Sequence, residues 1–253
     1  MNNFKNQLGL KTQFGLWQAL ASPYSAEICA GSGFDFLVFD GEHAPNTLPL
    51  ILQQLQAVAP YPIEALVRLA DDNRTGIKHH LDIGVKNLLV PMIETVEQAQ
   101  AVVAAIHYPP EGTRGVGAGL ARVSRWNRIP DYLHNAADEI CLILQVESSA
   151  GLAIIDQLAA MDGVDAIFVG PADLAADMGY LGQPTHAKVH AAVTDAIKSI
   201  VAGGCAAGVM TLDRDLVRQY QEAGASMLAV STDIALLARG AEAAISSFRN
   251  EIE

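Results

Sequence analysis

Acidic side chains stand at the ends of three apolar segments of this sequence. The segment Phe34 to His43 reads F-D-F-L-V-F-D-G-E-H, so that two carboxylates, a glycine and a histidine close an apolar run. The segments Cys141 to Glu147 (C-L-I-L-Q-V-E) and Ala166 to Asp173 (A-I-F-V-G-P-A-D) also end in an acid. Carboxylate oxygens are the ligands that Mg²⁺ prefers, and histidine is suited to proton transfer near neutral pH. This pattern predicts an enzyme.

Each candidate residue has a structural alternative. Glu147 and Asp173 together suit a divalent cation, but Asp173 precedes L-A-A-D and could instead be a helix N-cap. His43 follows D-G-E and is a candidate base, with a core histidine as the weaker alternative. Arg68 ends the run E-A-L-V-R, where it could hold a carboxylate or a developing oxyanion, or form a salt bridge inside a barrel. Asp82 lies in H-H-L-D-I-G, which by itself indicates a solvated helix face.

Strand-like apolar runs alternate with helical stretches along the whole chain. Eight strands are predicted, at Phe14 to Leu20, Phe34 to Asp40, Glu64 to Leu69, Asn87 to Met92, Cys141 to Glu147, Ala166 to Pro171, Ala206 to Met210 and Met227 to Ser231. Helices are predicted at Leu48 to Val58, Val96 to Ile106, Asp213 to Ala223 and Ile234 to Phe248.

This alternation predicts a single α/β domain over residues 1–253, an eight-stranded (β/α)8 TIM barrel. In such a barrel the C-terminal ends of all strands lie on one face, so the acids named above would converge there. A doubly wound open sheet is the alternative fold, but no G-x-G-x-x-G opens a helix after the first strand.

Composition limits the classes of partner. The chain has 253 residues, of which 51% are apolar, and its net charge is −12. Such a charge disfavours a nucleic acid or an acidic membrane as partner and favours small-molecule substrates. Cys29, Cys141 and Cys205 form no C-x-x-C pair, which argues against a disulfide framework or a thiolate metal site. The polar start of the chain lacks a signal core, so we expect a soluble, cytoplasmic protein.

An irregular stretch rich in glycine, proline and arginine runs from Tyr108 to Ala136. Loops of this length in compact domains tend to be functional or to pack against a partner. Its arginines could bind an anionic substrate or an acidic neighbouring subunit, or could be ordinary surface charges; they are Arg114, Arg122, Arg125 and Arg128.

Several long motifs resemble those of one enzyme family, the metal-dependent pyruvate aldolases of the 4-hydroxy-2-oxoheptane-1,7-dioate aldolase (HpcH/HpaI) type. The motifs are F-D-F-L-V-F-D-G-E-H-A-P-N, N-L-L-V-P-M, Y-P-P-E-G-T-R-G-V-G, S-R-W-N-R-I-P-D-Y and V-G-P-A-D-L-A-A-D-M-G-Y. The resemblance extends over nearly the whole chain and implies a phosphoenolpyruvate/pyruvate-type TIM barrel. The 2-keto-3-deoxy sugar-acid aldolases share most of these motifs.

The resemblance implies a role for each matching position. His43 would be the proton acceptor, acting directly or through a water, and Asp82 its orienting carboxylate. Arg68 would stabilise the enolate and bind pyruvate, while Glu147 and Asp173 would be the metal ligands. Further substrate contacts would come from Gln145 and the Ala172 backbone, and the candidates for the aldehyde end are Trp17, Asp40, Leu212 and Arg122 of a neighbouring subunit.

The implied reaction is the reversible cleavage of 4-hydroxy-2-oxoheptanedioate to pyruvate and succinate semialdehyde, with Mg²⁺, Mn²⁺ or Co²⁺ as cofactor and other aldehydes tolerated. It would belong to the catabolism of aromatic compounds. The alternative is a 2-dehydro-3-deoxyglucarate-type aldolase that gives tartronate semialdehyde. More remote alternatives are a mutase or lyase that uses a phosphate or thioester substrate and a non-catalytic barrel that binds an oxo acid. The family also implies a homo-oligomer, a hexamer, in which the helix Ile234 to Phe248 is exchanged between subunits.

Overall fold

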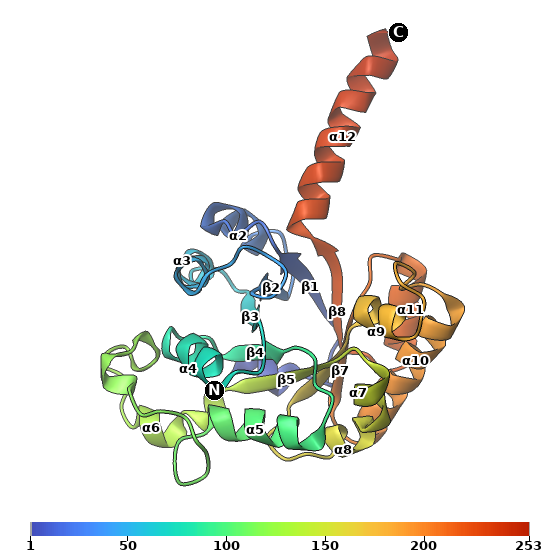
Figure 1. Ribbon diagram of the computed structural model, residues 1–253. Coiled ribbons are helices and arrows are strands. Elements are labelled where there is room, and N and C mark those ends of the chain that lie inside the picture. The colour runs from blue at the N-terminus through green and yellow to red at the C-terminus, as the bar shows by residue number, and fades with distance from the viewer. Residues whose placement is uncertain (1, 253) are drawn as a thin grey trace.

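Eight parallel strands close into a barrel in the computed structural model, which describes residues 2–252 (Figure 1). Each strand pairs with the strands before and after it in the chain, and β8 pairs with β1. The strands are β1 (Gln13–Gln18), β2 (Phe36–Asp40), β3 (Glu64–Arg68), β4 (Asn87–Val90), β5 (Cys141–Val146), β6 (Ala166–Val169), β7 (Ala206–Met210) and β8 (Met227–Thr232). This confirms the predicted (β/α)8 TIM barrel and excludes the open-sheet alternative.

Helices connect the strands and cover the outside of the barrel (Figure 1). The α-helices are α1 (Asn3–Gln7), α2 (Pro23–Ala30), α3 (Leu48–Val58), α4 (Arg74–Asp82), α5 (Val96–Ile106), α6 (Tyr132–Asn135), α7 (Ser149–Ala153), α8 (Ile155–Ala159), α9 (Pro171–Asp177), α10 (Ala187–Ala202), α11 (Arg214–Glu222) and α12 (Asp233–Ile252). Short 3₁₀ turns, η1 (Ala118–Leu120), η2 (Arg122–Ser124) and η3 (Ala137–Glu139), occupy part of the stretch between β4 and β5.

The boundaries differ from the prediction mainly at the C-terminal ends of strands. The helices α3 and α5 and the strand β7 have the predicted bounds. In contrast, β4 ends at Val90 and β6 at Val169, two residues earlier than predicted in each case. The residues that follow leave the sheet: Gly170 and Pro171 line the cavity, and the Met92 N–H donates to Glu147. Apolar character alone therefore overestimates the lengths of the strands.

Strand alternation divides the apolar residues into two layers. Phe36 and Val38 of β2 point into the barrel, where they pack with residues such as Phe168. Leu37 and Phe39 point outward into the layer between the strands and the helices. The short helix α1 contributes Phe4, which is fully buried within the inner cluster.

Gly15 shows how tightly the interior is filled. A Cβ atom at this position of β1 would lie 2.0 Å from Cε2 of Phe36, so no side chain other than hydrogen fits beside that ring. The missing side chain therefore allows a large aromatic ring to fill the barrel.

The last helix, α12, extends away from the barrel (Figure 1). Several of its large apolar side chains are exposed, including Leu237 at 62% and Phe248 at 63%. Within residues 2–252, every helix is too short or too polar to cross a membrane.

Candidate active site

Strand periodicity directs polar side chains to one end of the barrel. Asp40 follows Phe36 and Val38 on the inward face of β2, and Arg68 follows Leu66 on β3. On β5, Gln145 comes two residues after the inward-facing Ile143, and Glu147 comes two residues later. Because alternate residues share a face, these four polar side chains gather at the C-terminal ends of the strands.

Arg68 is held by three neighbours. Its Nε and Nη2 donate to the two carboxylate oxygens of Asp40, at 2.9 and 2.7 Å. Its Nη1 lies 2.8 Å from Oε2 of Glu42, an ion pair whose atoms are not aligned for a hydrogen bond. The guanidinium also lies over the Trp17 ring, 4.9 Å from the centroid. The salt bridge that sequence offered as an alternative is therefore present, and it fixes a buried cation in place.

Asp40 organises the loop that carries His43. Its Oδ1 accepts from the backbone N–H groups of Glu42 and His43, at 3.0 and 3.3 Å. Burial alone would raise the pKa of Asp40, but the hydrogen bonds and charge of Arg68, with the Trp17 hydrogen bond, hold it below its ordinary value. Both oxygens of Asp40 are engaged by this network, so its role at the aldehyde end stays a prediction.

His43 stands at the edge of the site rather than in the core. Its side chain is 64% exposed, and its Nε2 lies 3.8 Å from Oε2 of Glu42. Gly41 allows this loop to approach β3, since its N–H donates to the Arg68 carbonyl at 2.8 Å and a Cβ there would lie 2.6 Å from that oxygen. The core-histidine alternative does not apply to His43.

Glu147 is a buried carboxylate positioned by two donors. The backbone N–H of Met92 donates to its Oε1 at 3.0 Å, and Gln145 Nε2 donates to its Oε2. Burial raises the pKa of Glu147, and the negative charges of Asp173 and Glu42 raise it further. Met92 takes a left-handed conformation with φ of 53°, which is unusual for a residue with a side chain and is common at functional sites.

Asp173 lies in the first turn of α9, which follows β6. The N-cap of this helix is Gly170, so the N-cap alternative for Asp173 is wrong. Asp173 is exposed and lines the same cavity as Glu147, together with Ala172. The structure therefore brings together the predicted metal ligands and the predicted substrate contact at Ala172.

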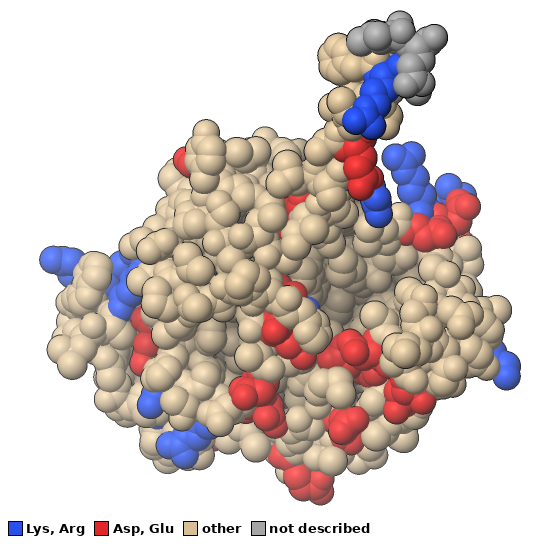
Figure 2. Space-filling model, turned by 45° about the horizontal axis from the view of Figure 1, so that its top comes forward, with Lys and Arg blue, Asp and Glu red and all other residues tan. Residues whose placement is uncertain are grey.

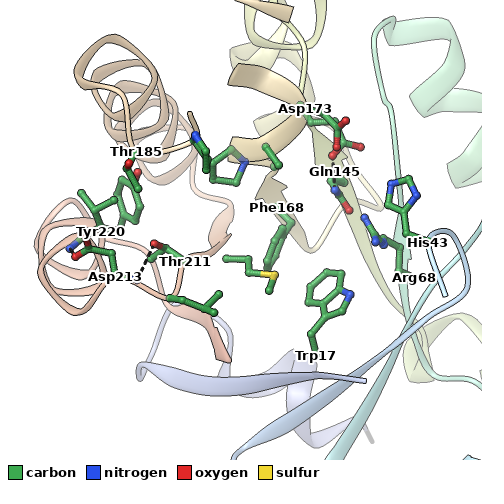
Figure 3. Close-up of a pocket in the computed structure, with 18 residues that line it drawn as sticks. Trp17, His43, Arg68, Gln145, Phe168, Asp173, Thr185, Thr211, Asp213 and Tyr220 are labelled. Atoms are coloured by element: carbon green, nitrogen blue, oxygen red, sulfur yellow. Dashed lines mark hydrogen bonds between the residues drawn. The ribbon is translucent and has the colours of Figure 1, made fainter. Parts of the chain in front are cut away.

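His43, Arg68, Gln145, Glu147 and Asp173 line one cavity of about 470 Å³. In Figure 3, Asp173, Gln145, His43 and Arg68 lie on one side of it, Thr185, Thr211, Asp213 and Tyr220 on the opposite side, and Trp17 and Phe168 between them. Leu212, for which an aldehyde contact is predicted, also lines the cavity. Figure 2 shows the hollow at the centre of this face of the molecule, with acidic side chains at its rim.

Asp82 does not line this cavity. It ends α4 on the outside of the barrel, where its Oδ1 accepts from Nη2 of Arg114 at 3.1 Å. Arg114 is itself buried, at 1% exposure, and lies over the Tyr108 ring. Within one chain Asp82 is thus not placed to orient His43. Arg122, the candidate from a neighbouring subunit, donates to the Ile83 carbonyl at 2.8 Å.

Several functional residues were missed by the sequence interpretation. Glu42 pairs with Arg68, and Gly170 leaves room beside Glu147, where a Cβ atom would lie 2.4 Å from Oε2. The D-G-E-H motif contained a signal for Glu42, because acids near a strand end converge with their neighbours. For Tyr220, within the amphipathic helix α11, no local pattern distinguishes a cavity residue from a core residue.

Comparisons with known proteins agree with this geometry. Residues 13–240 match the HpcH/HpaI aldolase/citrate lyase family. The chain is 53% identical over 251 residues to hydroxypyruvate/pyruvate aldolase of Deinococcus radiodurans, covering 99% of this chain and 91% of that protein. It is 50% identical over 250 residues to 4-hydroxy-2-oxo-heptane-1,7-dioate aldolase of Klebsiella pneumoniae, covering 98% of this chain and 94% of that protein.

A solved structure is also similar over nearly the full length. It is the crystal structure of an HpcH/HpaI aldolase/citrate lyase family protein from Burkholderia cenocepacia, with a TM-score of 0.94 and 36% identity. The match covers 98% of this chain and 100% of that one.

Proposed function

This chain belongs to the HpcH/HpaI aldolase/citrate lyase family, and from that membership we propose that it is a divalent-metal-dependent aldolase that cleaves 4-hydroxy-2-oxo acids to pyruvate and an aldehyde. One observation carries the proposal: the immobilised guanidinium of Arg68 lines the same cavity as the carboxylates of Glu147 and Asp173. The family and its named relatives support a carbon–carbon lyase, and the metal and substrates are the finer parts of the proposal.

The residues present fit a hard divalent cation. Glu147 and Asp173 line the same cavity, and two carboxylates would leave the remaining positions of such a cation to water and substrate. Gln145 Oε1 is buried without a hydrogen-bond partner in the described structure, and Gly170 keeps the space beside the Glu147 carboxylate open. Glu147 and Asp173 would hold the ion.

The cleavage needs a place for negative charge. When the bond between C3 and C4 of the substrate breaks, its electrons pass to the 2-oxo group as a pyruvate enolate. A cation held by Glu147 and Asp173 would supply Lewis acidity to that oxygen. Arg68 adds preorganised donors, because a guanidinium has five N–H groups and two of them donate to Asp40. Because its neighbours hold the guanidinium in place, it needs little reorganisation as negative charge develops on the substrate.

His43 would move the proton. It accepts the proton of the C4 hydroxyl, directly or through a water, as the C4–O bond becomes the aldehyde carbonyl. Protonation of C3 then gives the methyl group of pyruvate. In the reverse direction the enolate adds to an aldehyde and His43 returns the proton to the new hydroxyl.

The aldehyde half of the substrate differs among the family's members. The name of the Klebsiella relative implies succinate semialdehyde as the aldehyde, and the sugar-acid aldolases would give tartronate semialdehyde. We propose that the pyruvate half is fixed by Arg68, Glu147 and Asp173 while several aldehydes are accepted, 4-hydroxy-2-oxoheptanedioate being one substrate.

We further propose a homo-oligomer, a hexamer, in the cytoplasm. The extended position of α12 and its exposed apolar residues support exchange of this helix between subunits (Figure 1). If Asp82 orients His43, it must do so on another subunit, because within one chain it bonds to Arg114 on the outer face of the barrel.

Coupled detection of pyruvate tests the proposal. Wild-type enzyme should release pyruvate from 4-hydroxy-2-oxoheptanedioate with added Mn²⁺ and lose this activity in chelator. Glu147→Gln and Asp173→Asn should lose it even in excess Mn²⁺, while the matched control Glu97→Gln, an exposed acid on α5, should retain it. Unaltered pyruvate release by Glu147→Gln would remove the metal site from the mechanism.

A further inference from the structure

The loop that carries His43 is fixed at its far end by Asn46. Asn46 is the last residue of the motif D-G-E-H-A-P-N, and the proposed chemistry gives it no role. Its Nδ2 donates to the backbone carbonyl of Asp40 at 2.8 Å and, less closely, to that of Gln18 at 3.4 Å. One amide group therefore joins the end of the loop to its beginning on β2 and to the end of the neighbouring strand β1.

Gln54 of α3 holds the Asn46 amide in this orientation. The Gln54 residue is 1% exposed, and its Nε2 donates to Asn46 Oδ1 at 2.7 Å and to the Leu50 carbonyl at 3.2 Å. Because an amide nitrogen only donates, it faces the oxygen of Asn46 and leaves the Asn46 N–H groups to the two carbonyls. The reverse orientation of Asn46 would oppose two donors on one side and place its oxygen against carbonyls on the other.

In the described part of the chain, the other hydrogen bonds of this loop lie in its first half. The Asp40 carboxylate accepts from the N–H groups of Glu42 and His43. Beyond them, residues 44–46 belong to neither a helix nor a strand, and within the described residues their backbone makes no hydrogen bond to another backbone group. The Asn46 side chain thus supplies the hydrogen bonds that hold the second half of the loop.

The backbone of this loop matters because the His43 side chain has few contacts of its own. The side chain is 64% exposed, and its Nε2 lies 3.8 Å from Oε2 of Glu42, too far for a hydrogen bond. The place of the imidazole is therefore set by the loop backbone, and the residues that fix this backbone also fix the base.

We propose that Asn46 is a positioning residue for His43. By joining the end of the loop to Asp40 and Gln18, it keeps the imidazole at the edge of the cavity, where it accepts the proton of the C4 hydroxyl. This inference rests on the role of His43 in the proposed aldolase function. Asn46 is not a catalytic residue, since it does not line the cavity and acts through His43.

The test is the steady-state cleavage of 4-hydroxy-2-oxoheptanedioate by Asn46→Ala in saturating Mn²⁺. A base displaced by about 1 Å should lower kcat about ten- to a hundredfold. The KM and the Mn²⁺ concentration for half-maximal activity should stay within about twofold of wild type, because the substitution leaves the enolate end of the cavity intact. The solvent deuterium isotope effect on kcat should rise, because proton transfer to the displaced imidazole becomes the slow step.

Asn87→Ala is the matched control. Asn87 is a buried asparagine with the same pattern of bonds, since its Nδ2 donates to the Ala65 carbonyl at 3.0 Å and its Oδ1 accepts from Asn2 Nδ2 at 2.7 Å. It stands at the start of β4, at the end of the barrel opposite the cavity. Both variants should unfold at a lower temperature than wild type, but Asn87→Ala should keep the wild-type kcat and isotope effect.

Gln54→Leu is a second, milder variant that decides the question if Asn46→Ala does not fold. It removes the donor that orients Asn46 and keeps the Asn46 side chain and the apolar packing of α3. Its kcat should fall about two- to fivefold, as expected for one neutral hydrogen bond, again with KM unchanged.

Other outcomes overturn the inference. Wild-type kcat in Asn46→Ala and Gln54→Leu would show that the amide does not position His43. Equal losses in Asn46→Ala and Asn87→Ala would mean a general effect on packing, and a raised Mn²⁺ requirement in Asn46→Ala would place its effect at the enolate end. If wild type cleaves the substrate and any of these results is found, the inference fails and the aldolase function stands. If wild type neither cleaves the substrate nor exchanges the methyl protons of pyruvate, both fail.

Discussion

Gly170→Ala should disable the site without unfolding the barrel. The added Cβ would lie 2.4 Å from Glu147 Oε2, 2.8 Å from Glu147 Cβ and 3.1 Å from Gln145 Nε2. The backbone at Gly170 is extended, with φ of −96° and ψ of 97°, so alanine introduces no backbone strain of its own. The effect of the substitution is therefore steric and is directed at the side chains of Glu147 and Gln145.

The size of the effect follows from these distances. Ordinary contact with a Cβ begins near 3.4 Å, so the Glu147 carboxylate must withdraw by about 1 Å. That movement weakens the hydrogen bonds from the Met92 N–H and Gln145 Nε2. A displacement of this size at a reacting centre costs about a hundredfold in rate, or about 2.7 kcal/mol of transition-state stabilisation.

The assay is kcat/KM for pyruvate release over a Mn²⁺ titration, accompanied by thermal unfolding. Gly31→Ala is the control, because its Cβ would meet Tyr61 Cε1 at 3.7 Å, an ordinary contact. Gly170→Ala should lose about a hundredfold in kcat/KM and require more Mn²⁺, whereas the control should match wild type. Wild-type kinetics in Gly170→Ala would refute the assignment of this space to the metal site.

Three further experiments test the surrounding network. Arg68→Lys keeps the charge but loses the fork that binds Asp40, so kcat should fall by about 10²- to 10³-fold in steady-state assays, and a loss of less than about threefold would contradict a preorganised donor. Asp40→Asn should lower the free energy of unfolding by about 3 kcal/mol at pH 7 in urea titrations. The folded-state pKa of Asp40 lies below its ordinary value of 3.8. The stabilisation is therefore present above pH 3.8 and is lost as the pH falls through the folded-state pKa. A difference in unfolding free energy between Asp40→Asn and wild type that persists in acid would argue against the ion pair. His43→Ala and Asp82→Ala should each be inactive, and subunits of the two variants reassembled together should regain activity if Asp82 acts between subunits; a mixture that stays inactive would exclude that role.

Much of the fold was predictable because barrel strands are short apolar runs with polar ends. The run F-D-F-L-V-F-D at β2 shows the reason, since its two-residue alternation places Phe36 and Val38 inside and delivers Asp40 to the rim. The strand ends were less predictable. At Met92 and Gly170 the chain leaves the sheet and contacts the Glu147 side chain. The hydrophobicity of the sequence does not reveal this change of direction.

The site was predictable where its residues stand at strand ends and unpredictable where they meet through space. Glu147 and Arg68 follow from position and residue type, but the bidentate contact between Arg68 and Asp40 depends on the register of β2 and β3. Asp82 shows the opposite case, because its salt bridge to Arg114 joins α4 to a distant irregular stretch. Tyr220 depends on which face of α11 covers the cavity, which only the assembled barrel determines.

Proton exchange at the methyl group of pyruvate in D₂O, followed by NMR, tests the central claim most directly. It reports enolisation at the end of the cavity that contains Arg68, Glu147 and Asp173, whatever the aldehyde. Metal-assisted enolisation predicts exchange that stops when a chelator is added and returns with Mn²⁺ in wild type but not in Glu147→Gln. Exchange that continues unchanged in chelator would contradict it.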